Sequence, residues 1–198
     1  MRNDMERVYS VEKQLCIACE EGDYLNVKRL LEHVDIDVNA RDESIFGWTP
    51  LISACQSGNL QVIQLLLDDE RLNVNFGNHF GHSAFYCVCG SGKVDAAKLL
   101  MKHKKIDVNS SGVHGFTPLM NASYCGYIEI VKLILASGKE IRLNSINIDQ
   151  KTALQFAKER RNVQIANLLE AYNNNPNDIR DKLRRELGYL SKNFLSIN

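Results

Sequence analysis

The sequence of 198 residues lacks an excess of charge of either sign, because 24 Lys and Arg balance 24 Asp and Glu. A zero net charge gives no overall attraction to nucleic acid or an anionic membrane, so we expect neither partner. No apolar run approaches the roughly 20 residues of a membrane-spanning helix. The N-terminal stretch MRNDMERVYSVEKQ also lacks the apolar core of a secretory signal. We therefore expect a cytoplasmic protein, with the nucleus as an alternative.

The six cysteines lack the spacing of a metal site. Cys16 and Cys19 form one C-x-x-C pair, but no second C-x-x-C or H-x-x-x-H follows to complete a zinc site. Without a secretory signal, the thiols are expected to stay reduced. We predict no metal and no cofactor. Cys125 is expected to be the most reactive thiol, although no basic residue adjoins it in the sequence.

What the chain does contain is an internal repeat. Segments beginning at Gly47, Gly81, Gly115 and Gln150 align, as in GWTPLISACQSGNLQVIQLLL and GFTPLMNASYCGYIEIVKLIL. An earlier copy, KQLCIACEEGDYLNVKRLLEH, precedes them. One apolar position recurs at steps of 36, 34, 34 and 35 residues. It is occupied by Leu15, Leu51, Phe85, Leu119 and Leu154.

Each copy predicts two short helices. Thr49 and Pro50 are typical of a hydroxyl N-cap followed by proline at the first helical position. Gly58 ends this helix, since glycine adopts a positive φ at low cost. The apolar residues of segment 62–67 predict a second helix, and the turn-rich segment after it predicts a projecting hairpin. One such unit cannot bury its own apolar face, so the copies must stack.

The repeated pattern resembles the ankyrin repeat, G-x-T-P-L-x-x-A-x-x-x-G-x-x-x-x-V-x-x-L-L, over roughly residues 12–171. The third copy lacks the proline, and the fifth has Gln150 and Arg161 in place of two glycines. The resemblance implies an all-α solenoid of about five repeats with projecting hairpin loops and a C-terminal helical cap. The expected repeats are about 12–41, 42–77, 78–111, 112–146 and 147–171. Residues 1–11 would form an N-terminal extension and 172–198 a helical C-terminal extension.

The segment GHSAFYCVCGSGKVD, residues 81–95, contains fragments of two catalytic motifs. A nucleophile elbow around Ser83 would need glycine where Phe85 stands. A phosphate-binding loop ending at Lys93 would need Ser or Thr where Val94 stands. Ser83 aligns with Thr49, so we interpret it as a helix cap. No catalytic residues are predicted.

Two other patterns recur in the linking segments. Asn39, Asn75, Asn109 and Asn144 are interpreted as turn residues whose amides hold the hairpin. Asn39 also resembles a target of the asparaginyl hydroxylases that act on ankyrin repeats. The run KHKK at 102–105 is interpreted as solvated charge at a helix C-terminus. A nucleic-acid patch would need support from neighbouring copies, and the preceding copy has DDE at 68–70 instead.

The composition changes after Tyr172. The stretch NNNPND is a break, and an amphipathic helix follows from Asp178 to Leu190. Its apolar stripe consists of Ile179, Leu183, Leu187 and Leu190. We interpret it as a cover for the apolar end of the last repeat, which terminal repeats require. The alternative is a helix that binds a partner.

By resemblance, the function is non-catalytic protein–protein binding by a monomeric adaptor, scaffold or inhibitor in signalling. The alternatives are a cysteine-rich enzyme or metal- and redox-dependent repeat protein, and a fragment of a larger signalling chain. In ankyrin arrays, partner contacts come from the hairpins and from residues before the helix-ending glycine. We expect the corresponding positions here to bind the partner, with Val113 and Ile148 at matching hairpin sites. They are Ile45, Phe46, Trp48, His79, Phe80, His82, His114, Phe116, Tyr124, Lys151 and Arg160.

Overall fold

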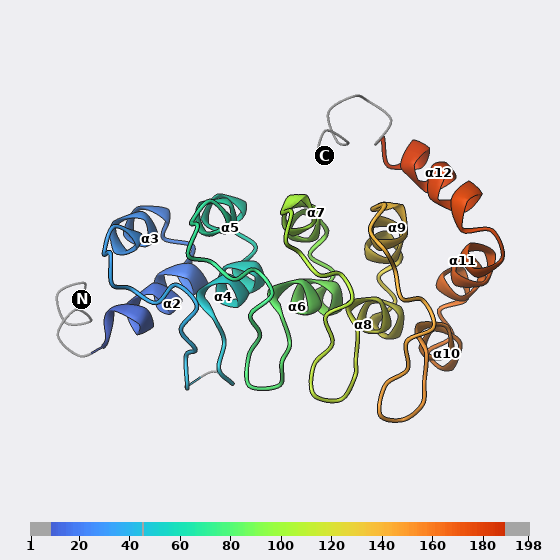
Figure 1. The fold of residues 1–198 in the computed structure, drawn as a ribbon, viewed down its shortest axis with the longest axis horizontal. Helices are drawn as coiled ribbons and strands as arrows, with labels where there is room; N and C mark the ends of the chain where they lie inside the picture. Colours follow the sequence, from blue (N-terminus) through green and yellow to red (C-terminus); the bar gives the residue numbers. More distant parts are fainter. Residues whose placement is uncertain (1–8, 45, 189–198) are drawn as a thin grey trace.

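A computed structural model of the chain describes residues 9–44 and 46–188. Five helix pairs follow one another and a last helix completes the array (Figure 1). The pairs are α2 (Val11–Glu21) with α3 (Tyr24–Leu31), α4 (Pro50–Ser57) with α5 (Leu60–Leu67), α6 (Ala84–Ser91) with α7 (Val94–Lys102), α8 (Pro118–Cys125) with α9 (Ile128–Ala136), and α10 (Ala153–Glu159) with α11 (Val163–Asn174). The last helix is α12 (Pro176–Glu186). The expectation of an all-α solenoid is confirmed.

The helix pairs form two layers (Figure 1). The first helix of each pair lies in an inner row, the second in an outer row, and the hairpins project beyond the inner row. Inner helices pack against their neighbours along the row, α2 on α4 and α6 on α8 among them. The continuous core therefore runs lengthwise between the rows, as it must when no repeat can bury its own apolar face.

Hydroxyl caps begin all five inner helices, with Ser10 capping α2 by accepting from the Lys13 N–H. The side chains of Thr49, Ser83, Thr117 and Thr152 each accept a hydrogen bond from the backbone N–H three residues later. The bond from Tyr86 N–H to Ser83 Oγ is 3.3 Å long. Ser83 is therefore a helix cap, as the alignment predicts.

A left-handed residue ends the inner helix of each repeat. Gly22, Gly58, Gly92 and Gly126 have φ between 69° and 84°. Arg161 takes φ 57° at the aligned fifth position. The shared left-handed φ agrees with the alignment of the fifth copy. Because Arg161 has a Cβ, this conformation costs about 1 kcal/mol relative to glycine.

The asparagines of the linking segments tie neighbouring repeats together. The Asn75 amide donates to the carbonyl of Lys105 over 2.7 Å, and its oxygen accepts from the N–H of Asp107 over 2.8 Å. Asn39 and Asn109 make the same pair of bonds to the following repeat. The three amides thus hold the linking segment of the following repeat rather than their own, because their partners lie 30 to 34 residues further along the chain.

The C-terminal helix α12 packs against α9 and α11. Leu183 is buried, and Ile179 and Leu187 are half-buried against the core. Arg184 also donates from Nε to the carbonyl of Ala136, the last residue of α9, over 3.0 Å. The predicted apolar face therefore covers outer helices of two repeats. Leu190, the last member of the predicted stripe, lies outside the described residues.

Candidate protein-binding surface

Backbone hydrogen bonds join the hairpin tips into one edge. His79 N–H donates to the carbonyl of Phe46, and Val113 N–H to that of Phe80, over 3.2 and 2.8 Å. Ile148 N–H continues the series to the carbonyl of His114 over 3.0 Å. Because each bond joins equivalent positions of successive repeats, the side chains at the tips are spaced regularly along the solenoid.

A row of aromatic rings begins at these tips. The ring centroids of Phe46 and Phe80 are 6.2 Å apart, and those of Phe80 and His82 are 5.9 Å apart. His82 then stacks on Tyr86 at 4.0 Å, which brings the row from the hairpins to α6. We call Phe46, Phe80, His82 and Tyr86 the aromatic row. Burial lowers the pKa of His82, and the nearby His114 lowers it further. Both effects favour the neutral form of the His82 imidazole.

Exposed apolar side chains continue the row along the other tips. Phe46 is 67% and Phe80 is 42% exposed. Val113 and Ile148 follow on the next two hairpins, 65% and 66% exposed. An exposed apolar residue thus stands at each of four successive tips. Ile45 belongs to the expected set but lies outside the described residues.

Other expected contact residues form ring contacts and an ion pair where the fourth and fifth repeats meet. Phe116 lies 4.7 Å from the Phe156 ring, and Tyr124 meets the same ring edge-on at 5.8 Å. The Arg160 guanidinium lies 4.5 Å above the Tyr124 ring. Lys151 forms an ion pair with Glu159. Phe116, Tyr124 and Arg160 thus make contacts between the fourth and fifth repeats, whereas the Lys151 ion pair lies within the fifth repeat, and Tyr124 and Arg160 remain exposed.

The remaining expected residues lie on the second to fourth hairpins. Trp48 is half-buried and packs against the core. His79 is exposed and contacts the Glu43 carboxylate over 2.8 Å. His114 is exposed. Sequence reasoning missed Tyr86, although its place four residues after His82 indicates that the two rings can meet.

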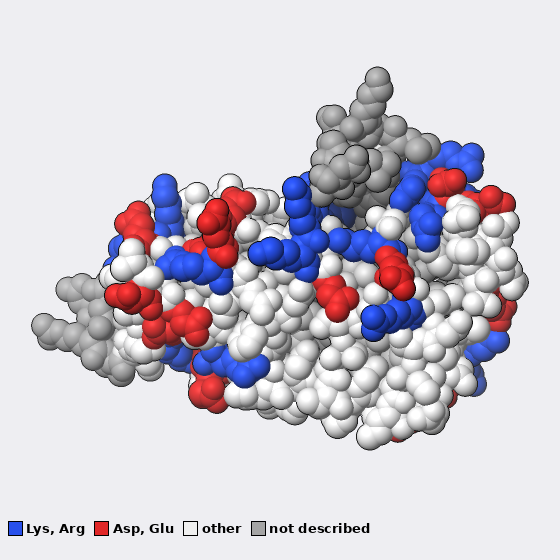
Figure 2. Space-filling model, viewed as in Figure 1, with Lys and Arg blue, Asp and Glu red and all other residues white. Residues whose placement is uncertain are grey.

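The inner face carries almost no charge over its middle repeats. Segments 46–67, 72–92 and 108–128 contain no Lys, Arg, Asp or Glu, and they include all of α4, α6 and α8. The hairpins on the right of Figure 2 are accordingly a largely uncharged surface. Over these repeats the charged side chains lie mainly in α7 and α9 and in the turns that follow α5, α7 and α9.

The cysteines of the array are free thiols. Burial raises the pKa of Cys16 and Cys87 to about 12 and raises that of Cys19, Cys55 and Cys89 as well. Cys125 is exposed, yet burial of its sulfur raises its pKa, and the charge of Arg160 offsets this only in part. Among residues 9–44 and 46–188, no three His, Cys, Asp or Glu come together in a way that could hold a metal ion.

The sequence profile described as "Ankyrin repeats (3 copies)" matches residues 15–112, 70–145 and 109–180. The chain is an ankyrin-repeat protein. Ankyrin repeats generally mediate protein–protein interaction and are generally non-catalytic. The ankyrin-repeat chain is also similar to oxysterol-binding protein-related protein 1 of Rattus norvegicus, at 41% identity over 63 residues. That similarity spans 28% of this chain and 7% of the rat protein. No helix within the described part of the chain is long and apolar enough to cross a membrane.

Proposed function

We propose that this chain is a non-catalytic adaptor or inhibitor that binds a protein partner along its hairpin tips and inner helices. The observation that carries the proposal is the exposed apolar residue at each of four successive tips, Phe46, Phe80, Val113 and Ile148. Exposed apolar side chains lower the free energy of binding when a partner removes them from water. Within this proposal the protein acts as a monomer in the cytoplasm or nucleus.

The chemistry of the surface defines the partner. The inner face of the middle repeats contains no charged residue, so an uncharged apolar segment fits it without leaving a charge unpaired. Phe80, His82 and Tyr86 form a continuous apolar surface from a hairpin to an inner helix. Binding at this surface should depend little on salt, because apolar burial is not screened by ions.

Affinity capture with the full chain, followed by mass spectrometry, identifies the partner. The same capture with a Phe46→Ala/Phe80→Ala variant should lose it, because truncating an aromatic anchor costs about 2 kcal/mol or more. Leu25→Ala is the matched control, since Leu25 is 77% exposed but lies on the outer helix α3.

Calorimetry with the identified partner then measures the affinity. We expect each single variant, Phe46→Ala or Phe80→Ala, to weaken binding about tenfold or more with an unchanged circular dichroism spectrum. Trp48→Ala and Phe116→Ala should weaken it similarly, but both rings are half-buried, so their stability must be measured alongside. Wild-type affinity in the Phe46→Ala/Phe80→Ala variant would refute the proposed surface.

A further inference from the structure

The two halves of the chain carry net charges of opposite sign, which sum to about zero. Residues 9–92 contain 5 basic and 12 acidic side chains, a net charge of −7. Residues 93–188 contain 16 basic and 10 acidic side chains, a net charge of +6. A solenoid keeps distant segments apart, so these charges remain separated along its length (Figure 1). Net charge alone therefore does not describe the field at either end.

Lysines gather where α7 ends. Lys102 is the last residue of α7, Lys104 and Lys105 follow it, and Lys139 comes from the turn after α9. We call these four residues the basic edge. The Lys105 backbone N–H donates to His103 Nδ1 over 3.3 Å, and burial together with the charges of Lys105 and Lys139 lowers the pKa of His103. Figure 2 shows Lys and Arg gathered over α7 and toward α9.

The following repeat adds positive charge beside the KHKK run at 102–105. The turn of the preceding repeat carries the acidic residues DDE at 68–70. The repeat that follows KHKK instead contributes Lys139, whose charge acts on His103. The backbone that carries these lysines is fixed, since Asn75 binds the Lys105 carbonyl and Asn109 binds that of Glu140. Over the described part of the chain, Lys104 and Lys105 have no ion-pair partner.

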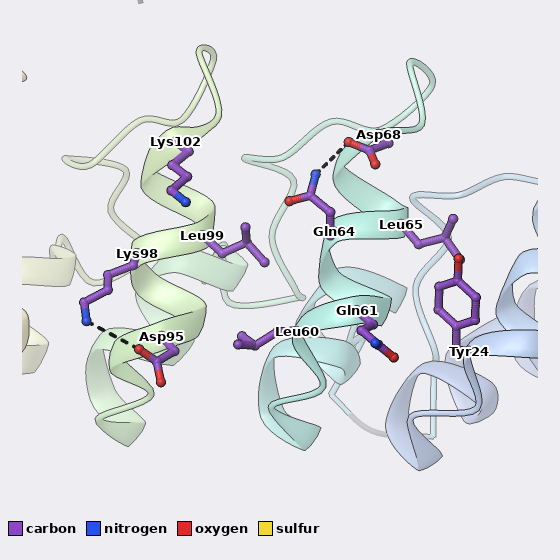
Figure 3. Close-up of a pocket in the computed structure, with 10 residues that line it drawn as sticks. All are labelled: Tyr24, Leu60, Gln61, Gln64, Leu65, Asp68, Asp95, Lys98, Leu99 and Lys102. Carbon is purple, nitrogen blue, oxygen red and sulfur yellow. Dashed lines mark hydrogen bonds and ion pairs between the residues drawn. The ribbon is translucent and has the colours of Figure 1, made fainter. Parts of the chain in front are cut away.

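An open groove with an apolar floor leads to the basic edge. Its volume is about 710 Å³; Leu60 and Leu99 lie between α5 and α7, and Leu65 lies beside Tyr24 on the α3 side of α5 (Figure 3). A smaller hollow of about 380 Å³ continues it past Leu99 to three lysines of the basic edge, Lys102, Lys104 and Lys105. The carboxylates of Asp68 and Asp95 on the groove walls already have partners in Gln64 and Lys98.

We infer that the groove and the basic edge together form a second docking surface, which binds an acidic segment of a protein that also carries apolar side chains. The apolar side chains would enter the groove while carboxylates meet Lys104 and Lys105, which form no ion pair with any described residue. A peptide helix can enter a concave apolar floor between two helices. A flat surface of lipid headgroups cannot enter it. A nucleic acid backbone offers phosphates but no apolar side chain for this floor.

This surface is separate from the hairpin surface. The groove lies in the outer row of helices, whereas the hairpins project beyond the inner row (Figure 1). The two surfaces also differ in chemistry, since one is uncharged and the other basic. Binding at the basic edge should therefore weaken as salt rises, while binding at the hairpins should not.

The test measures fluorescence anisotropy of the full chain with a designed peptide. The probe is a labelled helical peptide of about 18 residues with Leu at i and i+4 spacing and Glu on both sides of the stripe. Its control has Gln in place of Glu. We expect the Glu peptide to bind about tenfold tighter at about 50 mM NaCl and to lose most of this advantage at about 300 mM.

Two variants assign the contact to the basic edge. Lys104→Glu/Lys105→Glu should weaken binding of the Glu peptide about tenfold or more, since it replaces attraction by repulsion. Lys28→Glu changes an exposed outer-row lysine of the acidic half and should leave the affinity unchanged. Leu60→Ala, in the groove floor, should weaken both peptides to the same extent.

Equal affinity for the Glu and Gln peptides, or full affinity in Lys104→Glu/Lys105→Glu, would overturn the inference. Tighter lysine-dependent binding to phosphatidylserine vesicles or to a short DNA duplex would also overturn it, in favour of that ligand. The Phe46→Ala/Phe80→Ala variant should bind the Glu peptide as the wild type does. A failure at the basic edge therefore leaves the proposed hairpin surface untouched.

Discussion

Replacing Leu183 by alanine should loosen the C-terminal helix α12. Leu183 is 2% exposed and is the buried member of the apolar face that α12 turns toward α9 and α11. Truncating a buried leucine removes its transfer free energy and leaves a cavity, at a cost of about 2–5 kcal/mol. Because α12 is terminal and can separate from the array, we expect the lower part of this range, about 2–3 kcal/mol.

This loss is measurable in two ways. A change of about 2–3 kcal/mol should lower the melting temperature of a chain of this size by roughly 4–12 °C. Hydrogen exchange of the α12 amides should accelerate about thirtyfold or more, since local opening reports the same free energy. Amides of α4 and α6 lie far along the array and should keep their protection, because each repeat contacts only its neighbours.

Leu25→Ala is the control, because Leu25 is 77% exposed and its truncation should leave the melting temperature unchanged. If Leu183→Ala leaves both the melting temperature and the exchange of α12 unchanged, the packing of α12 does not stabilise the array. Unchanged melting combined with lost partner binding would instead support the alternative, in which α12 recruits a partner.

Four further changes test separate features. Ser123→Ala should stabilise the chain by about 1 kcal/mol in urea titrations, because within the described residues the buried Ser123 hydroxyl has no hydrogen-bond partner; a destabilised variant would contradict this. Asn75→Ala should cost about 1–3 kcal/mol by removing two bonds between repeats, whereas Asn144→Ala, which makes no such bonds over the described chain, should be nearly neutral. Arg161→Gly should raise the melting temperature slightly, because glycine adopts φ 57° without the strain of about 1 kcal/mol that a side chain causes. Iodoacetamide should label Cys125 before the buried thiols, and mass spectrometry would show whether a buried thiol reacts first. Because the raised pKa of Cys125 keeps its thiol protonated, labelling at pH 8 should be slower than that of free cysteine and should accelerate as pH rises.

Features that depend on a few neighbouring residues could be predicted from the sequence alone. The repeat period is visible in the recurring residues themselves, and the hydroxyl cap at Ser83 depends on a hydrogen bond within one helical turn. The apolar face of α12 is also local, because its side chains recur at helical spacing. These signals were sufficient to identify the solenoid and to reject the two catalytic motifs.

Features that depend on contacts between repeats required the tertiary structure. Phe46 and Phe116 both flank a hairpin glycine, yet Phe46 stays exposed while Phe116 packs on Phe156. The partner of Asn75 lies in the next repeat. The sequence contains the charges of both halves, but only the linear stacking keeps them apart and brings Lys139 near His103. The burial of these side chains and the identity of their contact partners depend on residues about one repeat away. The pattern within a single repeat does not include those residues.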